Sequence, residues 1–174
     1  DKPYYYDISF VGTLYDDEFK LYDSLHDLQP HVKRRVDEVI RAQERIYGCD
    51  LIGQKQLITD DMILEMQKLV DFEDTGHFFM DEKQILRDMI RRKVSQLERV
   101  EILQMLAEVA PVSLFTREDQ IAPEGVNDHG YAEYRHKMPE IFRLSKVNLN
   151  ITLRTILSGI PLRALDVMAA GGFL

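Results

Sequence analysis

Cysteine is almost missing from this chain of 174 residues, because Cys49 is its only one. A single cysteine cannot build a disulfide framework, so the sequence favours a reducing compartment and predicts a cytoplasmic location. No apolar run approaches the roughly 20 residues that a membrane-spanning helix needs, so we expect no membrane span. Nine glycines and six prolines are too few for a collagen-like or low-complexity chain.

Several motifs of enzyme chemistry are missing as well. The five histidines show no HExxH pair or other tight ligand spacing, which predicts that the chain has no metal site. No Gly-x-Ser-x-Gly motif marks a nucleophilic serine. The 22 Lys and Arg are outnumbered by 30 Asp and Glu, giving a net charge of −8. This charge offers phosphate backbones no general attraction, so we expect no nucleic-acid partner.

Short apolar runs alternate with segments of helical periodicity, which is the pattern of an α/β domain. The predicted strands are 8–12, 112–116 and 147–151, with another beginning at 173. The predicted helices are 30–47, a helix that opens at Thr59, 81–110, 138–145 and 161–170. We therefore predict a Rossmann-like fold with a mainly parallel sheet.

We interpret residues 1–174 as a single α/β domain. The helical block from about residue 19 to residue 92 is longer than one crossover between strands requires, so part of it is predicted to be a helical insertion. The chain ends on apolar Phe173 and Leu174, which predicts a fragment truncated at its C-terminus. The alternative is a natural end that packs into the core.

The segment from Ser158 to Asp166 is the strongest candidate for a binding site. In an open parallel sheet, ligands bind at the carboxyl ends of the strands. Gly159 precedes a helix whose first turn is fixed by Pro161, and unpaired N–H groups at such a start favour a phosphate. Arg163 could add a bidentate contact to that phosphate, and Asp166 could accept hydrogen bonds from ribose hydroxyls. Spacing alone favours another interpretation, a solvated ion pair between Arg163 and Asp166.

Two weaker candidates are a glycine turn and a group of tyrosines. Gly12 and Thr13 follow the first predicted strand, where glycine lets a backbone approach a diphosphate closely. An ordinary turn explains the same two residues, since no Walker motif or dinucleotide fingerprint accompanies them. The triplet 4–6, Tyr131 and Tyr134 could stack on a base or a sugar, although aromatic residues near strands more often pack in the core.

The sequence KVNLNITLRTILSGIPLRALDVMAAGGFL, residues 146–174, resembles a known family. It is similar to the donor-lobe core of bacterial glycosyltransferases of the CgeB, or spore-maturation-protein, type. The resemblance extends to 134–139, to 6–15 and to 42–48, and it is weakest from about residue 50 to residue 130.

This resemblance implies a GT-B fold, of which the chain would be the C-terminal, donor-binding lobe. Residues 112–174 would form the nucleotide-sugar-binding core, and the N-terminal acceptor lobe would be missing. Asp166 stands where the wider group has an acid that holds the donor ribose. Ser158 stands where many retaining members have a second acid, which leaves the stereochemical outcome and the catalytic residues open. The implied donor-binding residues are Gly12, Thr13, Gly159, Ile160, Arg163 and Asp166.

The expected activity is transfer of a glycosyl group from a nucleotide sugar to an acceptor, with no metal or other cofactor implied. Because the acceptor lobe would be missing, we expect the isolated chain to transfer little or no sugar. A different interpretation is a non-catalytic α/β interaction module. In that case the helix 81–110 packs against a partner or against a second copy in a homo-oligomer.

Overall fold

The structure, a computed structural model, describes residues 3–15, 22–69 and 81–174. Parts of the predicted helical block, residues 19–21 and 70–80, lie outside the described residues. The chain divides into two compact units. Unit 1 comprises Asp1–Asp16, Glu98–Thr152 and Ser158–Leu174, and unit 2 comprises Asp17–Leu97 and Leu153–Leu157.

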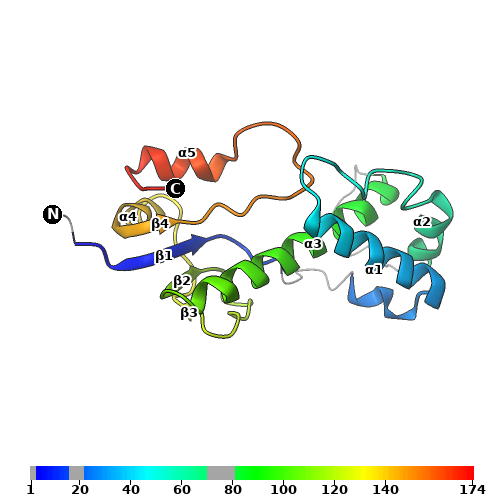
Figure 1. Ribbon diagram of the computed structural model, residues 1–174, viewed down its shortest axis with the longest axis horizontal. Helices are drawn as coiled ribbons and strands as arrows, with labels where there is room; N and C mark the ends of the chain where they lie inside the picture. Colours follow the sequence, from blue (N-terminus) through cyan, green and yellow to red (C-terminus); the bar gives the residue numbers. More distant parts are fainter. Residues whose placement is uncertain (1–2, 16–21, 70–80) are drawn as a thin grey trace. The chain divides into compact units, whose positions relative to one another are not determined.

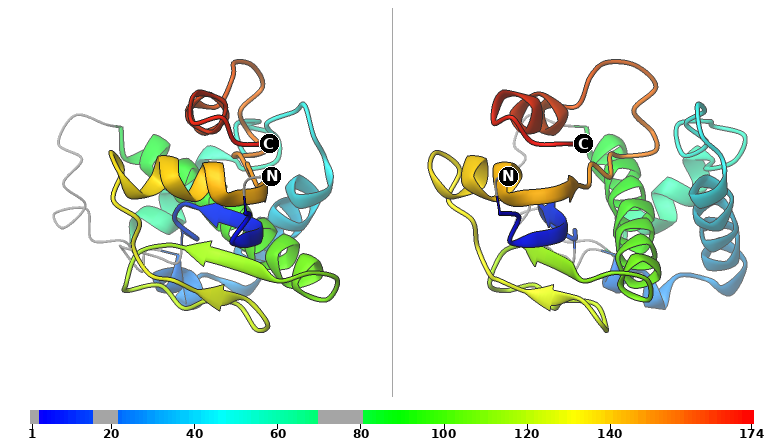
Figure 2. Two further views of the ribbon diagram at one scale, coloured as in Figure 1. Left: turned by 90° about the vertical axis from the view of Figure 1, so that its left-hand side faces the viewer. Right: turned by 60° about the vertical axis from the view of Figure 1, so that its left-hand side comes forward.

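Unit 1 is built on a four-stranded sheet in which all paired strands are parallel (Figures 1 and 2). The order across the sheet is β3-β2-β1-β4, so the first strand in the sequence is central. This arrangement confirms the predicted α/β fold with a parallel sheet. The strands are β1 (Tyr6–Val11), β2 (Val112–Phe115), β3 (Asn127–Asp128) and β4 (Ser145–Asn148).

Three details of the strand prediction are wrong. β4 runs from Ser145 to Asn148 and not from 147 to 151. It begins earlier than predicted because the backbone at Ser145 already pairs with Tyr6. The two-residue β3 lies between the predicted strand 112–116 and the predicted helix 138–145, where the sequence predicts no strand, and its exposed side chains leave no apolar signal in the sequence. No strand begins at Phe173, whose carbonyl oxygen accepts a hydrogen bond from the Asn148 amide at 2.9 Å while its side chain is 68% exposed.

Helices cover both faces of this sheet. Neighbouring strand residues point to opposite faces, and Phe10 packs in one core cluster while Val11 packs in another. The last turns of α3 (Glu82–Ala107) bring Leu103 to the Phe10 face. On the Val11 face pack α4 (Lys137–Leu144) and α5 (Leu162–Ala169). These helices confirm the predicted ones at 138–145 and 161–170 to within a residue.

Unit 2 is helical, with a core of aliphatic and methionine side chains. A helix opens at Thr59, as the sequence predicts, and Thr59 caps it, because its hydroxyl oxygen accepts a hydrogen bond from the Met62 amide at 3.3 Å. The buried Arg87 guanidinium donates to the carbonyl oxygens of Ile52 at 2.7 Å and Ile58 at 3.1 Å. The elements of this unit are η1 (Asp23–Asp27), α1 (Pro30–Arg45), α2 (Asp60–Gln67) and the first part of α3. Among the described residues, no helix combines the length and apolar character needed to cross a membrane.

Asn148 connects the last segment of unit 1 to the sheet. Its side-chain nitrogen donates to the carbonyl oxygens of Phe142 at 3.0 Å and Phe173 at 2.9 Å. Its side-chain oxygen accepts a hydrogen bond from the Ser9 hydroxyl at 2.9 Å. Gly172 passes so close to this group that an added Cβ would lie 2.6 Å from the Phe142 oxygen. A buried amide thus joins β1, the end of α4 and the segment after α5.

We expect the substitution Asn148→Leu to lower the free energy of unfolding by about 2–4 kcal/mol, because it leaves buried polar groups without a partner. Urea unfolding followed by circular dichroism measures this change. Asn127→Leu on β3 is the matched control, since this side chain is exposed, and it should change stability by no more than about 0.5 kcal/mol. Equal effects of the two substitutions would show that Asn148 does not have the connecting role.

Candidate functional site

The order of the strands reverses its direction at β1. The chain leaves β1 for β2 and β3 on one side, and then returns to β4 on the other side. β1 and β4 are neighbours, and the chain runs away from them in opposite directions across the sheet. The loops that follow two such strands diverge at the carboxyl edge of the sheet, which is where ligands bind in open α/β sheets. Here these loops begin at Gly12, after β1, and at Leu149, after β4.

Arg99 of α3 connects the two loops. One of its terminal nitrogens, Nη1, donates to the carbonyl oxygen of Thr13, and the other, Nη2, donates to that of Ile151 at 2.8 Å. The guanidinium carbon lies 4.4 Å from the centre of the Tyr15 ring and 5.4 Å from that of Phe10. Only 8% of Arg99 is exposed, so a buried cation stands at the carboxyl edge between β1 and β4.

Burial lowers the pKa of the Arg99 guanidinium, because the charged form loses its hydration. Tyr15 and Glu98 act in the opposite direction, and the like charge of Arg163 lowers the pKa further. The contribution of Arg163 is the smallest of these, and Arg163 is itself paired with Asp166.

The turn after β1 is held by hydrogen bonds within the protein. The Gly12 amide donates to the carbonyl oxygen of Phe115 at 3.0 Å. The Leu14 amide donates to the side-chain oxygen of Gln120 at 2.8 Å, and the Gln120 nitrogen donates to the Thr13 hydroxyl at 2.8 Å. The same hydroxyl accepts a hydrogen bond from the Tyr15 amide at 3.1 Å. The amides of Gly12, Leu14 and Tyr15 are therefore occupied by partners within the protein.

The segment before α5 keeps the open character that the sequence predicts. Gly159 has a φ of +98°, in the region that favours glycine, and no side chain or backbone atom lies within 4 Å of a Cβ added there. Ile160 is 69% exposed. Pro161 precedes the first turn of α5, and no side chain caps this helix start. The first-turn amides of α5 are therefore not used by a capping side chain.

Arg163 and Asp166 form the ion pair that spacing alone favours, with Nη1 and Oδ2 3.1 Å apart. The Tyr134 hydroxyl donates to Asp166 Oδ1 at 3.2 Å. Arg163 also contacts the Met138 sulfur and lies over the Phe142 ring, 5.5 Å from its centre. The two charged side chains are 27% and 28% exposed, respectively. A carboxylate has about four acceptor positions, so Asp166 keeps capacity for further hydroxyl donors.

Sequence reasoning missed Arg99 and Gln120. Arg99 lies among acidic residues on a long predicted helix, where a solvated charge is the ordinary expectation. Its carbonyl partners are 86 residues away at Thr13 and 52 residues away at Ile151. Gln120 is separated from Thr13 by 107 residues. Contacts of such separation leave no local pattern from which the site could be assembled.

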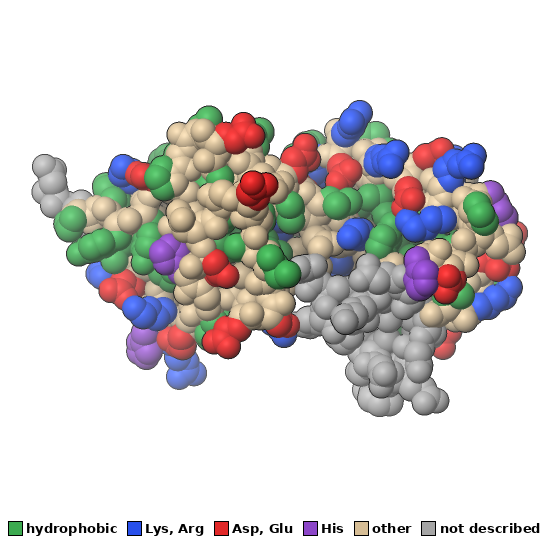
Figure 3. Space-filling view, turned by 90° about the horizontal axis from the view of Figure 1, so that it is seen from below, with side chains coloured by type: hydrophobic (Ala, Val, Ile, Leu, Met, Phe, Trp, Pro, Cys, Tyr) green, Lys and Arg blue, Asp and Glu red, His purple; other side chains and the backbone are tan. Residues whose placement is uncertain are grey.

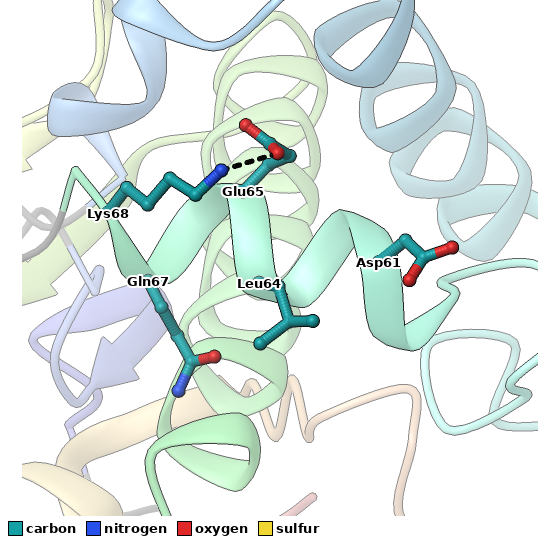
Figure 4. A pocket seen from close by; sticks show the side chains of 5 residues that line it. All are labelled: Asp61, Leu64, Glu65, Gln67 and Lys68. Atoms are coloured by element: carbon teal, nitrogen blue, oxygen red, sulfur yellow. Dashed lines mark hydrogen bonds and ion pairs between the residues drawn. The ribbon is translucent and has the colours of Figure 1, made fainter.

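A hollow of about 550 Å³ lies along α2 in unit 2 (Figure 4). Its described lining residues come from one helix and its end, and their side chains point in different directions. Lys68 is paired with Glu65, with 2.7 Å between nitrogen and oxygen. This surface presents no convergent set of polar groups. The described lining residues are Asp61, Leu64, Glu65, Gln67 and Lys68.

No protein-family model matches the chain, and neither a curated protein nor a solved structure matches it. The family resemblance at residues 146–174 therefore stays a prediction. Within 3–15, 22–69 and 81–174, no three His, Cys, Asp or Glu side chains are grouped as ligands of a metal ion. The arguments for a function rest on the geometry of the carboxyl edge.

We expect Arg99→Lys to lower the free energy of unfolding by about 1–3 kcal/mol at pH 7, because one ammonium group cannot bridge both carbonyls. Burial should lower the folded-state pKa of the new lysine below its unfolded value of about 10.4. Between these two values the unfolded state binds more protons, so the stability lost at pH 7 should partly return toward pH 10.

Urea unfolding of wild type and variant at pH 7 and at pH 10 measures this recovery. Arg143→Lys, on the exposed surface of α4, is the control and should show neither the loss nor the recovery. A pH-independent loss in Arg99→Lys would argue against a buried charge at this position.

Proposed function

We propose that this chain is the donor-binding lobe of a glycosyltransferase, which binds a nucleotide sugar and transfers its glycosyl group to an acceptor held elsewhere. The observation that carries the proposal is the strand order β3-β2-β1-β4, with the buried guanidinium group of Arg99 between the loops that follow β1 and β4, where this order reverses. The resemblance of residues 146–174 to such lobes supports the same proposal.

In this proposal, the diphosphate of the donor lies near Arg99 and Arg163. The Nη groups of Arg99 donate to two carbonyls, so Arg99 acts through its charge and by holding the loops in place. Arg163 is more accessible and donates directly. The uncapped start of α5, after Gly159 and Ile160, adds amide donors and the positive end of the helix dipole.

Asp166 accepts the ribose hydroxyls with the acceptor positions that Arg163 and Tyr134 leave open. When the glycosyl bond breaks, negative charge accumulates on the departing nucleoside diphosphate. Cations and helix amides at the phosphates stabilise that charge. No residue of the chain is assigned as acid, base or nucleophile, and we expect the isolated chain to bind a donor without appreciable transfer.

Unfolding in the presence of UDP, GDP, ADP, CDP and dTDP, each added separately, tests the proposal. One nucleotide should stabilise the wild type, by about 2.7 kcal/mol at 100 times its Kd. Asp166→Ala should abolish most of this stabilisation, because the ribose loses its acceptor. Asp119→Ala is the matched control, since Asp119 forms an exposed ion pair with Arg117 at the same 3.1 Å separation, and it should bind like wild type.

Binding that is unaffected by Asp166→Ala would contradict the ribose role. Failure of all five nucleotides to stabilise the wild type would contradict the donor-lobe proposal for this chain. That second result would favour the alternative, a non-catalytic interaction module. One observation favours the alternative as well, because α5 exposes a line of apolar side chains at Leu162, Leu165 and Met168.

A further inference from the structure

A second surface of unit 1 carries aromatic side chains. A cleft of about 370 Å³ lies between α4 and rings from β1, β2 and the segment after β3. Its wall includes Tyr5, 72% exposed, and Tyr131, 65% exposed. Hydrophobic side chains also gather at the left-hand end of Figure 3. Exposed aromatic rings beside a cleft of this size are typical of a ligand-binding surface.

The rings behind the two tyrosines are fixed by one another. His129 stacks on Phe115, with centroids 4.9 Å apart and planes 18° apart. Tyr6 meets both rings edge-on, at 5.2 Å from Phe115 and 5.5 Å from His129. The His129 Nε2 atom lies 3.2 Å from the Ser113 hydroxyl oxygen. Such a rigid cluster presents ring surface to a ligand at little cost in side-chain entropy.

A second hollow, of about 610 Å³, adjoins the first. Tyr5, Tyr6 and His129 line both of them. We call the two hollows together the aromatic groove. Two hollows that share a wall of rings suit an elongated ligand with repeating units better than a single compact molecule.

The charges around the aromatic groove do not suit an anion. Lys137 is paired with Glu140 at 3.7 Å, and Asp7 is paired with Lys146. Asp128 adds a further carboxylate, whose oxygen accepts a hydrogen bond from the Gly130 amide at 2.8 Å. The carboxylates thus outnumber the ammonium groups here. They can accept hydrogen bonds from hydroxyl groups, and they repel phosphates and sulfates.

We propose that the aromatic groove binds a neutral oligosaccharide. A pyranose ring has an apolar face of C–H groups, which packs on a tyrosine ring, and hydroxyls at its edge, which donate to carboxylates. Tyr5 and Tyr131 supply the exposed ring faces, while Asp128, Glu140 and the Asn127 amide supply acceptors. This site is separate from the proposed donor site and uses none of its residues.

Titration of the full chain with cellohexaose, maltohexaose and the hexamer of N-acetylglucosamine tests the proposal. Isothermal titration calorimetry measures binding without depending on the tyrosines that the variant removes. At least one hexasaccharide should bind with a Kd of roughly 1 mM or below. The double variant Tyr5→Ala/Tyr131→Ala should bind it at least about tenfold more weakly, because both ring faces are lost.

Tyr4→Ala is the matched control, since Tyr4 is 56% exposed and does not line either hollow, and it should bind like wild type. Failure of all three glycans to bind at roughly 10 mM, or equal binding by the double variant, would overturn the proposal. So would equally tight binding of hexagalacturonate or UMP with the same dependence on Tyr5 and Tyr131. Asp166→Ala should leave glycan binding unchanged, so this proposal and the donor-lobe proposal can fail separately.

Discussion

Both edges of β1 are hydrogen-bonded, to β2 over Ile8–Val11 and to β4 over Tyr6–Ser9. The rest of unit 1 depends on this central position. Phe10 and Val11 of this central strand are buried in core clusters on opposite faces of the sheet, which requires helices on both sides. It also forces the chain to return across the sheet between β3 and β4. That return separates the loops at Gly12 and Leu149 and creates the edge at which a ligand can bind.

Buried polar side chains connect segments that the backbone ladder leaves apart. Asn148 joins β4 to the segment after α5, Gln120 joins the turns after β1 and β2, and Arg99 joins the loops after β1 and β4. Each is buried, and each places its donors on carbonyl or hydroxyl oxygens of distant segments. Removing such a group leaves its buried partners unsatisfied. Arg99 therefore serves the architecture as well as the charge of the carboxyl edge.

Unit 1 offers two surfaces with contrasting chemistry. The carboxyl edge has the buried guanidinium group of Arg99, and α5 has an uncapped start, which together favour a diphosphate. The aromatic groove has ring faces and an excess of carboxylates, which favour hydroxyl groups and disfavour phosphate. A lobe that holds a nucleotide sugar and a glycan chain needs both kinds of surface. The two proposals are thus chemically compatible, although each rests on its own residues.

The sequence by itself determined the features that depend on neighbours in the chain. Apolar periodicity placed the helices, including the one that opens at Thr59, and the spacing of Arg163 and Asp166 predicted their ion pair. Only the tertiary structure decided the strand order, the existence of β3 and the position of Arg99, because each depends on hydrogen bonds between segments far apart in the sequence. Such bonds satisfy backbone carbonyls of any residue type, and they therefore impose no recognisable pattern on the residues that make them.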